Sequence, residues 1–239
     1  MREPGAAFIT GGTGAVGRAV TRAFLASGYR VAVTYRGAEG WSALTRAEAA
    51  AADEGRLLGL AADVTDPDAM RRAADQAARG LHGLDLLLHV AGGYAGGENV
   101  EDIAPETVRG MMELNLLSAF WAARAVVPHA KRSDRGRLLF ISSRGALEPG
   151  PGAAAYAASK LGLHALVAAL ANELKSAGVT ANAVLPGLID TPANRDAMPN
   201  GDFDHWVKPE AIAALLLFLA SDEAASTSGA LIPIDGGSA

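Results

Sequence analysis

The sequence predicts a single α/β domain built on a doubly wound parallel sheet of about seven strands, with helices on both faces. Seven short apolar runs alternate along the chain with stretches of helical character. The runs are nearly continuous in apolar residues, which is typical of parallel strands covered on both sides. A glycine-rich turn directly follows the first run. The 239 residues fit one domain, spanning 1–239, because single α/β domains often run to roughly 200–250 residues.

Strands are expected wherever a short run of Val, Leu, Ile and Ala is bounded by turn-forming residues. The predicted strands are residues 6–10, 30–35, 57–62, 84–90, 137–142, 180–185 and 231–234.

Helices are expected in the gaps between these strands, at residues 15–27, 42–54, 66–79, 105–131, 154–177 and 209–221. Asp66 followed by Pro67 is typical of a helix N-cap and first helical position. Pro209 is expected to open the last long helix in the same way.

The composition excludes several classes of function. A net charge of -5 makes nucleic acid an unexpected partner, and the absence of cysteine excludes disulfides, thiolate zinc sites and cysteine nucleophiles. No metal site is expected. The first strand begins at residue 6, which leaves no room for a signal peptide, and the longest apolar run, 211–220, is shorter than the ~18 residues that a membrane span needs. We therefore expect a cytoplasmic protein that does not insert in a membrane.

The turn after the first strand matches the G-x-G-x-x-G pattern through Gly12, Gly14 and Gly17. By itself such a pattern often marks only a turn. Here it stands between a strand and a helix, the context of a Rossmann-type phosphate loop, in which glycines let the backbone approach a pyrophosphate. The expected cofactor contacts in this loop are Gly11, Thr13, Gly14, Ala15, Val16 and Gly17.

The end of the second strand bears on the choice of nicotinamide cofactor. NAD-binding domains usually place an acid there to bind the ribose hydroxyl, whereas this strand ends in Tyr35 and Arg36. An arginine can bind a 2′-phosphate through charge-assisted hydrogen bonds, and Arg18 would add positive charge. A solvent-exposed arginine is the alternative. The sequence favours NADP(H), and NAD(H) stays possible.

Tyr156 and Lys160 lie four residues apart in a predicted helix and therefore share one face. An ammonium beside a phenol lowers the phenol pKa from about 10, so that the pair can exchange a proton near neutral pH. Alone, such a pair usually marks an ordinary helix face. Together with the glycine loop, it predicts hydride transfer between a nicotinamide and a carbonyl or imine.

With these residues and Ser143, which lies thirteen residues before Tyr156, the chain resembles the short-chain dehydrogenase/reductase family from Ala6 to Gly237. The resemblance implies that Tyr156 donates or accepts the proton and that Ser143 binds the substrate oxygen. It also implies that Lys160 holds the nicotinamide ribose, while Asn115 interrupts a helix and supports the proton relay.

The same resemblance implies further cofactor contacts. Asp63 would contact the adenine, although a helix cap is the alternative, and the segment after the sixth strand would meet the carboxamide. His89 and Val90 replace the two asparagines of the family's Asn-Asn-Ala-Gly motif, so part of the hydrogen bonding of the central sheet must come from elsewhere. His89 is expected to be a strand-end histidine and not a catalytic base. The implied contacts are Asp63, Val64, Ala91, Gly92, Pro186, Gly187, Ile189 and Thr191, with Tyr156 and Lys160.

Residues 12–17, 90–97 and 190–199 also resemble the dihydropteridine reductase branch. That branch reduces a quinonoid pterin, typically lacks the serine and asparagine, and prefers NADH. Ser143 and Asn115 therefore favour carbonyl chemistry, because a ketone needs its oxygen polarised and protonated.

Side chains on the substrate side are harder to assign. For each candidate taken singly, a packing or surface role is favoured, and the substrate-loop segment 192–207 is short. The family resemblance implies a homodimer or homotetramer, paired through the helices at 105–131 and 154–177. The substrate candidates are Tyr94, Leu147, Asn194, His205 and Trp206, together with Ser143.

Three functions follow in order of preference. The first is an NADPH-dependent carbonyl reductase with Tyr156 as general acid and base. The second is a pteridine or quinone reductase. The third is a non-catalytic NADP sensor, which would not need the proton relay.

Overall fold

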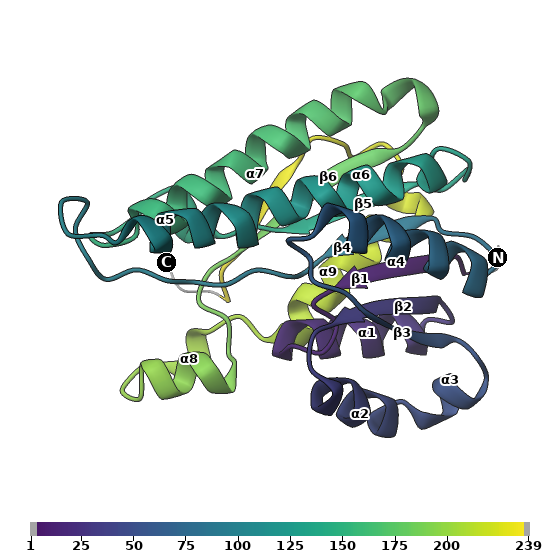
Figure 1. Ribbon diagram of the computed structural model, residues 1–239, viewed down its shortest axis with the longest axis horizontal. Helices are drawn as coiled ribbons and strands as arrows, with labels where there is room; N and C mark the ends of the chain where they lie inside the picture. Colours follow the sequence, from purple (N-terminus) through teal and green to yellow (C-terminus); the bar gives the residue numbers. More distant parts are fainter. Residues whose placement is uncertain (1–3, 237–239) are drawn as a thin grey trace.

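A seven-stranded parallel sheet forms the middle of three layers in the computed structural model, which describes residues 4–236 (Figure 1). The strand order is β3-β2-β1-β4-β5-β6-β7, and every pairing is parallel. The predicted doubly wound fold is therefore confirmed. The strands are β1 (Ala6–Thr10), β2 (Arg30–Tyr35), β3 (Leu57–Ala61), β4 (Leu86–His89), β5 (Arg137–Ile141), β6 (Thr180–Pro186) and β7 (Leu231–Ile234).

The strand predictions hold in number and place. The largest difference is β4, which is shorter at both ends than the predicted run 84–90. Leu84 is nevertheless buried, so its apolar character serves packing before the strand begins. Gly237, the last residue of the predicted C-terminal motif, lies outside the described residues.

The chain reverses its direction of winding at β1. From β1 it winds outward to β2 and β3, and it then crosses back to place β4 on the other side of β1. In open α/β sheets, ligands bind in the crevice outside the carboxyl ends of the strands at such a switch point. The residues that follow Thr10 and His89 are therefore placed to form a binding site.

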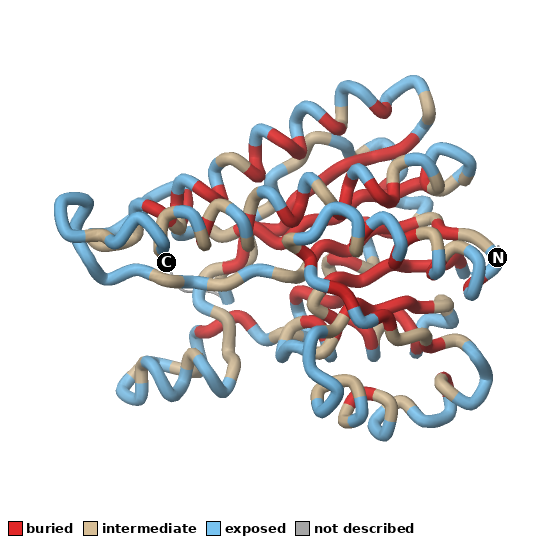
Figure 2. Tube along the Cα trace, viewed as in Figure 1, coloured by how far each residue is buried: buried red, intermediate tan, exposed pale blue. Residues whose placement is uncertain are grey.

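Helices cover both faces of the sheet (Figure 1). One face packs under α4 (Pro67–Gly80), α6 (Ser118–Ala130) and α7 (Ala154–Glu173), and its core includes Phe8 and Phe140. The other face packs on α1, α2, α3 and α9, and its core includes Ile9, Phe24 and Leu216. Figure 2 shows the strands as the most continuously buried part of the chain. The helices of the second face are α1 (Ala15–Ala26), α2 (Ala38–Ala47), α3 (Ala49–Asp53) and α9 (Pro209–Ala220).

The long helix predicted at 105–131 is interrupted. It begins as α5 (Pro105–Met111), widens into a π-helix, η1 (Met112–Leu117), and continues as α6. Such π-helical insertions frequently occur at functional sites. Asn115 lies in the middle of η1, as the predicted helix interruption requires.

Two other predictions about helices need correction. The predicted helix 42–54 begins earlier, at Ala38, and divides at Glu48, whose backbone (φ -116°, ψ 38°) is not helical. The segment 192–207, expected to be a loop, contains the short helix α8 (Pro192–Ala197), whose N-cap Thr191 accepts a hydrogen bond from the Asn194 amide. Short 3-10 turns occur at Arg144–Ala146, Lys175–Ala177, Phe203–His205 and Asp222–Ala224.

Among the described helices, α7 is the one whose length and hydropathy would suffice to cross a membrane. It packs on the sheet, where Leu163, Val167 and Leu170 belong to the buried core. Core helices of this kind pass the same test, so α7 gives only weak evidence for a membrane span.

The N-cap role of Asp66 at the start of α4 can be tested by mutation. The Asp66 carboxylate accepts hydrogen bonds from the amides of Asp68 (2.8 Å) and Ala69 (3.1 Å), as predicted for the N-cap. We expect Asp66→Ala to lower the free energy of unfolding by about 1 kcal/mol in urea. Asp68→Ala is the matched control, because Asp68 is exposed and only its backbone takes part in the cap. Equal losses in the two variants would contradict the capping role.

Candidate active site

The glycine loop after β1 has no room for larger side chains. Gly11 has a left-handed backbone (φ 66°), and a Cβ there would lie 3.0 Å from the Ala91 backbone. A Cβ on Gly17 would overlap the Gly11 carbonyl oxygen, and one on Gly12 would lie 2.6 Å from Val33. The Gly14 amide donates to the Gly11 carbonyl (3.1 Å), which closes the turn directly before α1. The backbone is therefore held close to the N-terminus of α1, where a phosphate is favourably bound.

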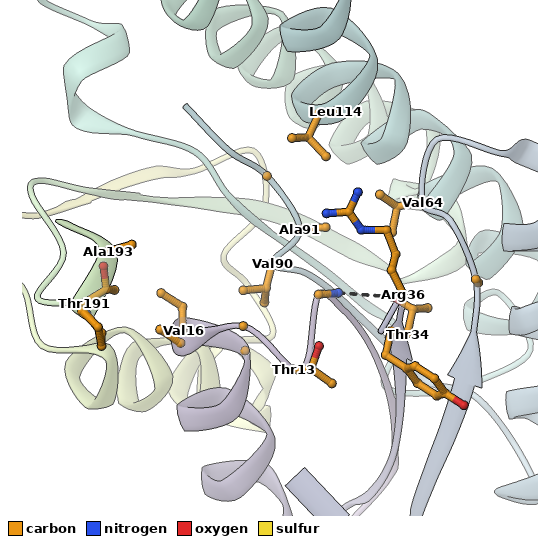
Figure 3. Close-up of a pocket in the computed structure, with 18 residues that line it drawn as sticks. Thr13, Val16, Thr34, Arg36, Val64, Val90, Ala91, Leu114, Thr191 and Ala193 are labelled. Atoms are coloured by element: carbon orange, nitrogen blue, oxygen red, sulfur yellow. Dashed lines mark hydrogen bonds between the residues drawn. The ribbon is translucent and has the colours of Figure 1, made fainter. Parts of the chain in front are cut away.

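A cavity of about 560 Å3 lies over this loop at the switch point of the sheet (Figure 3). Its walls come from the segments after β1, β2, β3, β4 and β6, with Leu114 of η1. Figure 3 shows Val16, Thr191 and Ala193 at one end of the cavity and Thr34, Arg36 and Val64 toward the other. Because its lining residues come from the ends of several neighbouring strands, the cavity suits an extended ligand.

Most of the predicted cofactor residues line this cavity. Sequence reasoning missed Thr34, whose hydroxyl accepts a hydrogen bond from the Gly11 amide (3.2 Å), and Leu114, which precedes Asn115 in η1. Each of the other missed residues stands next to a predicted site residue in the sequence, and this adjacency was the signal that could have identified it. The predicted residues that line the cavity are Gly11, Thr13, Gly14, Ala15, Val16, Gly17, Tyr35, Arg36, Val64, Ala91, Gly92 and Thr191, and the missed ones are Thr34, Ala62, Val90, Leu114, Pro192 and Ala193.

Positive charge gathers at the β2 end of the cavity. The Arg36 side chain extends from the end of β2 across the opening, between Val64 and Ala91 in the view of Figure 3. Arg18 donates from Nε to the Thr13 carbonyl (2.9 Å), so its guanidinium is held against the glycine loop.

Asp63 is not the cap of α4, because Asp66 has that role. Its carboxylate instead accepts hydrogen bonds from the Thr65 amide (2.9 Å) and hydroxyl (2.8 Å). These bonds and the nearby Arg36 hold the pKa of Asp63 below its usual value, so the side chain is a fixed anion beside the cavity residues Ala62 and Val64.

Asn115 is fully buried and connects three segments. Its Oδ1 accepts from the Gly93 amide (2.9 Å), and its Nδ2 donates to the Gly93 carbonyl (3.0 Å) and to the Ser159 hydroxyl (3.1 Å). A Cβ on Gly92 would lie 2.9 Å from Asn115 Oδ1 and 3.1 Å from Lys160 Nζ. The structure therefore brings Asn115 and Lys160 together around Gly92.

Lys160 is buried and donates a hydrogen bond to the Ile141 carbonyl (2.9 Å). Burial lowers the pKa of Lys160 to about 8, because the charged ammonium has lost most of its contact with water. The adjacent Ser142 is also buried, and its hydroxyl lies 2.7 Å from His164 Nε2. Ser142 is thus occupied within the core, which agrees with the choice of Ser143 for the site.

Burial raises the pKa of Tyr156, a hydrogen bond with the Ser143 side chain lowers it, and Tyr94 raises it. The predicted lowering by Lys160 is therefore wrong for this structure, because the ammonium is directed to the Ile141 carbonyl and the phenol is largely desolvated. The Tyr94 ring stands edge-on to Tyr156, with centroids 5.0 Å apart. Tyr94 is itself 62% exposed.

The segment between β6 and α9 is held by its own contacts. The Asp190 carboxylate binds Arg195 and Lys208, and Asn194 Nδ2 donates to the Ile189 carbonyl (2.8 Å). Trp206 is only 6% exposed and packs edge-on against Phe203 (4.8 Å). The ring thus braces the segment from within, and the substrate contact of Trp206 stays a prediction.

The remaining substrate candidates are at the surface. Leu147 is half exposed, and His205 pairs with Asp202 on the outside of the segment (2.7 Å). Pro186 ends β6, and Gly187 and Ile189 lie between it and Thr191; the Gly187 amide donates to the Ile234 carbonyl (2.8 Å).

Comparison with known proteins agrees with this geometry. A family model described as Enoyl-(Acyl carrier protein) reductase matches residues 12–239. The chain is 32% identical to 4-formylbenzenesulfonate dehydrogenase TsaC1/TsaC2 of Comamonas testosteroni, covering 97% of this chain and 96% of that protein. It is 33% identical to 3-oxoacyl-[acyl-carrier-protein] reductase MabA of Mycobacterium tuberculosis, covering 96% and 90%.

The solved structures give the same result. A short-chain dehydrogenase/reductase from Serratia marcescens superposes with a TM-score of 0.88 at 33% identity, covering 97% of this chain and 96% of that one. A blue fluorescent protein from a metagenomic library, in complex with NADPH, superposes with a TM-score of 0.88 at 32% identity over the same shares. The chain belongs to the short-chain dehydrogenase/reductase family.

Members of this family are oxidoreductases that bind NAD(P) and act on small-molecule substrates, so this member is an oxidoreductase. The local resemblance to the dihydropteridine reductase branch finds no support in these relatives and stays a prediction.

The lowered pKa of Lys160 has a measurable consequence for stability. The unfolded chain binds a proton at this lysine up to about pH 10.5, and the folded protein only up to about pH 8, so folding is favoured increasingly as the pH rises through that window. We expect wild-type protein to gain about 2 kcal/mol of unfolding free energy relative to Lys160→Met between about pH 7.5 and about pH 10. Urea unfolding of both proteins without cofactor measures this. Parallel pH curves would contradict the buried, destabilised ammonium.

Proposed function

We propose that this protein is an NADPH-dependent reductase of ketones or aldehydes, with Tyr156 as the general acid. The observation that supports this most is the Ser143 side chain beside the desolvated Tyr156 phenol, whose pKa it lowers, next to the Asn115 and Lys160 pair that flanks Gly92. Ser143 and Tyr156 provide two hydroxyls that can bind one carbonyl oxygen, which is what polarisation and protonation of a ketone require.

The cavity fits a dinucleotide. Bound there, NADPH would supply the hydride. Gly11, Gly12 and Gly17 leave no space for a Cβ, so the loop backbone is available for the pyrophosphate at the start of α1. Arg36 would bind the 2′-phosphate, and Arg18 would add positive charge nearby. Lys160, with three donor hydrogens, would hold the ribose hydroxyls once it exchanges its bond to Ile141.

The proton chemistry suits reduction. A raised pKa keeps the Tyr156 phenol protonated at neutral pH, which is the form that donates. The Ser143 hydroxyl, bound to that phenol, would orient the carbonyl oxygen. Asn115 would support resupply of the proton by fixing Gly93 and Ser159 around Lys160.

The names of the relatives favour carbonyl and hydroxy compounds. They include a 4-formylbenzenesulfonate dehydrogenase, 3-oxoacyl-[acyl-carrier-protein] reductases and a D-beta-hydroxybutyrate dehydrogenase. We propose that this chain likewise interconverts a carbonyl and an alcohol. A pteridine or quinone substrate is the second candidate, favoured by the local resemblance of residues 90–97 and 190–199.

We further propose a cytoplasmic homodimer or homotetramer. The part of the molecule formed by η1, α6 and α7 carries Leu117, Phe120 and Leu161, each about two-fifths exposed. Burial of such side chains in a symmetric interface would stabilise the assembly.

The roles of Tyr156 and Ser143 can be separated by substrate. We expect Tyr156→Phe to lower turnover of an aryl ketone with NADPH by roughly 100-fold or more, because the proton donor is lost. Ser143→Ala should cripple ketone reduction but affect quinonoid dihydropterin reduction much less, because an easily reduced quinonoid system needs little acid assistance.

Tyr29→Phe is the matched control, since Tyr29 is a partly buried tyrosine that packs on Phe24 away from the cavity. Equal losses on both substrates in Ser143→Ala would contradict the role of the serine, and unchanged turnover in Tyr156→Phe would remove the proposed general acid. Absence of any turnover in wild-type protein would favour a sensor.

The role of Arg36 predicts the choice of cofactor. We expect Arg36→Ala to raise the KM for NADPH by roughly 10- to 100-fold, because charge-assisted hydrogen bonds to the 2′-phosphate are lost. The KM for NADH should change little. Arg22→Ala is the control, because Arg22 is an exposed arginine on α1 that pairs with Glu48 outside the cavity. A wild-type preference for NADH would overturn the assignment.

A further inference from the structure

His89, the last residue of β4, is fully buried at the switch point of the sheet. It stands opposite Thr10 of β1 and Phe140 of β5 in the strand register. The next two residues, Val90 and Ala91, form part of the cavity wall. The imidazole therefore lies directly beneath the proposed cofactor site without reaching its surface.

Both ring nitrogens of His89 are hydrogen-bonded, and each partner continues the chain of bonds. Nδ1 lies 3.0 Å from Thr10 Oγ1, which accepts from the Ala91 amide (3.2 Å). Nε2 lies 3.2 Å from Ser118 Oγ, whose hydroxyl donates to the Leu114 carbonyl (2.5 Å). One buried chain thus runs from Ala91, after β4, to Leu114 in η1.

The bonding pattern assigns a single tautomer to the ring. The one proton of the Ser118 hydroxyl goes to a carbonyl, which can only accept, so Ser118 Oγ must accept from His89 Nε2–H. Nδ1 of the neutral ring is then an acceptor, and it receives the Thr10 hydroxyl proton. Each hydroxyl donates one hydrogen bond and accepts one, and each ring nitrogen makes one. A buried polar network that is fully hydrogen-bonded in this way rigidifies its surroundings.

Protonation would break this pattern. An imidazolium has two donors, and Nδ1–H would face Thr10 Oγ1, whose remaining partner is the Ala91 amide donor. The Lys160 ammonium is the charge that acts on the ring. Burial, and then Lys160, lower the pKa of His89 to about 3, so the ring is neutral throughout the working pH range.

The two ends of the chain belong to segments that Asn115 also joins. Asn115 of η1 holds Gly93 through both its amide oxygen and its amide nitrogen. The segment 90–93 is therefore fixed at Ala91 through Thr10, the partner of His89, and at Gly93 through Asn115. Leu114 and Ala91 both line the cavity, so the two bridges together set its width.

We propose that His89 is a positioning residue for hydride transfer, a neutral strut that fixes the segment after β4 against η1 and so sets the nicotinamide end of the cavity relative to Asn115. This inference rests on the proposed function for its kinetic consequence, but its geometric consequence does not require turnover. It also bears on the departure from the family motif, because His89 bonds to Thr10 within the sheet and adds a bond to Ser118 that the shorter asparagine side chain would not reach.

Two single variants cut the same arm of the strut, the bond between His89 and Ser118. His89→Asn places an acceptor near the position of Nδ1 and can keep the bond to Thr10, but it is too short to reach Ser118. Ser118→Ala removes the other side of that same bond and leaves His89 in place. Asn182→Ala is the matched control, because Asn182 is equally buried and bridges Thr227 and Ala230 on the far side of the sheet.

The measurements are NADPH affinity, the emission of the bound nicotinamide, kcat with an aryl ketone, and thermal stability. In His89→Asn and Ser118→Ala we expect the affinity for NADPH to stay near the wild-type value. We expect the variants to lose the increase in NADPH fluorescence that binding to the wild-type protein produces. We expect kcat to fall roughly 10- to 100-fold, because the reacting groups are misplaced. The double variant should lose no more kcat than either single variant, because both substitutions remove the same hydrogen bond. Asn182→Ala should lose stability while the folded protein keeps kcat and emission.

The outcomes separate this inference from the proposed function. If the His89 and Ser118 variants only lose stability, as the control does, His89 is merely structural and the proposal is overturned. Additive losses in the double variant would overturn the single strut. If wild-type protein binds NADPH but reduces no carbonyl, the proposed function fails, and the emission comparison still decides whether His89 sets the cavity. Should His89→Asn fail to fold, Ser118→Ala cuts the same bond.

Discussion

The close approach of the turn after β1 to the segment after β4 is the constraint on which the rest of the site depends. Gly11 adopts a left-handed backbone against Ala91, and its amide is held by Thr34 of the neighbouring strand. Side chains at this contact would push the two walls of the switch point apart. Because three adjacent strands are locked together here, the helix that follows the turn begins at one fixed place, and the cavity above it has a defined floor.

Burial, more than charge pairing, controls the ionisable groups around this floor. Desolvation lowers the pKa of Lys160 and of His89 and raises the pKa of Tyr156, so each group is pushed toward its neutral form. Lys160 is tolerated as a cation because it has a carbonyl partner and a neutral neighbour in His89. A second cation at His89 would repel the first in the same desolvated region. The neutrality of the strut and the charge of the lysine are therefore linked.

Periodicity and the glycine pattern predicted the strands and the cofactor loop because those features follow from local chemistry. The interruption around Asn115 was also predicted, although only through the resemblance of the motif. The break at Glu48 coincides with a contact between distant residues, because Glu48 pairs with Arg22 of α1 (3.0 Å). The helix α8 and the burial of Trp206 rest on side-chain contacts within their own segment, such as Phe203 with Trp206, which apolar periodicity does not reveal. A tryptophan in a polar segment has the same sequence signature whether it packs inward or lines a pocket. Likewise, nothing local distinguishes His89 from an ordinary strand-end histidine; its partner Ser118 is 29 residues away.

The segment over the substrate side is ordered by its own charges. Hydrogen bonds from Arg195 and Lys208 hold the pKa of Asp190 well below its usual range, and Arg195 also stacks over Phe203 (4.4 Å). A segment fixed in this way costs little ordering entropy when a ligand arrives, because it is already in place. It also cannot fold far over a small substrate without breaking those pairs. In the proposed function, substrate choice would then come from side chains that project freely near the phenol, and Tyr94, exposed and edge-on to Tyr156, contacts that phenol directly. The proposed chemistry would thus be set by buried residues, while selectivity would be left to an exposed aromatic ring that can change without disturbing the core.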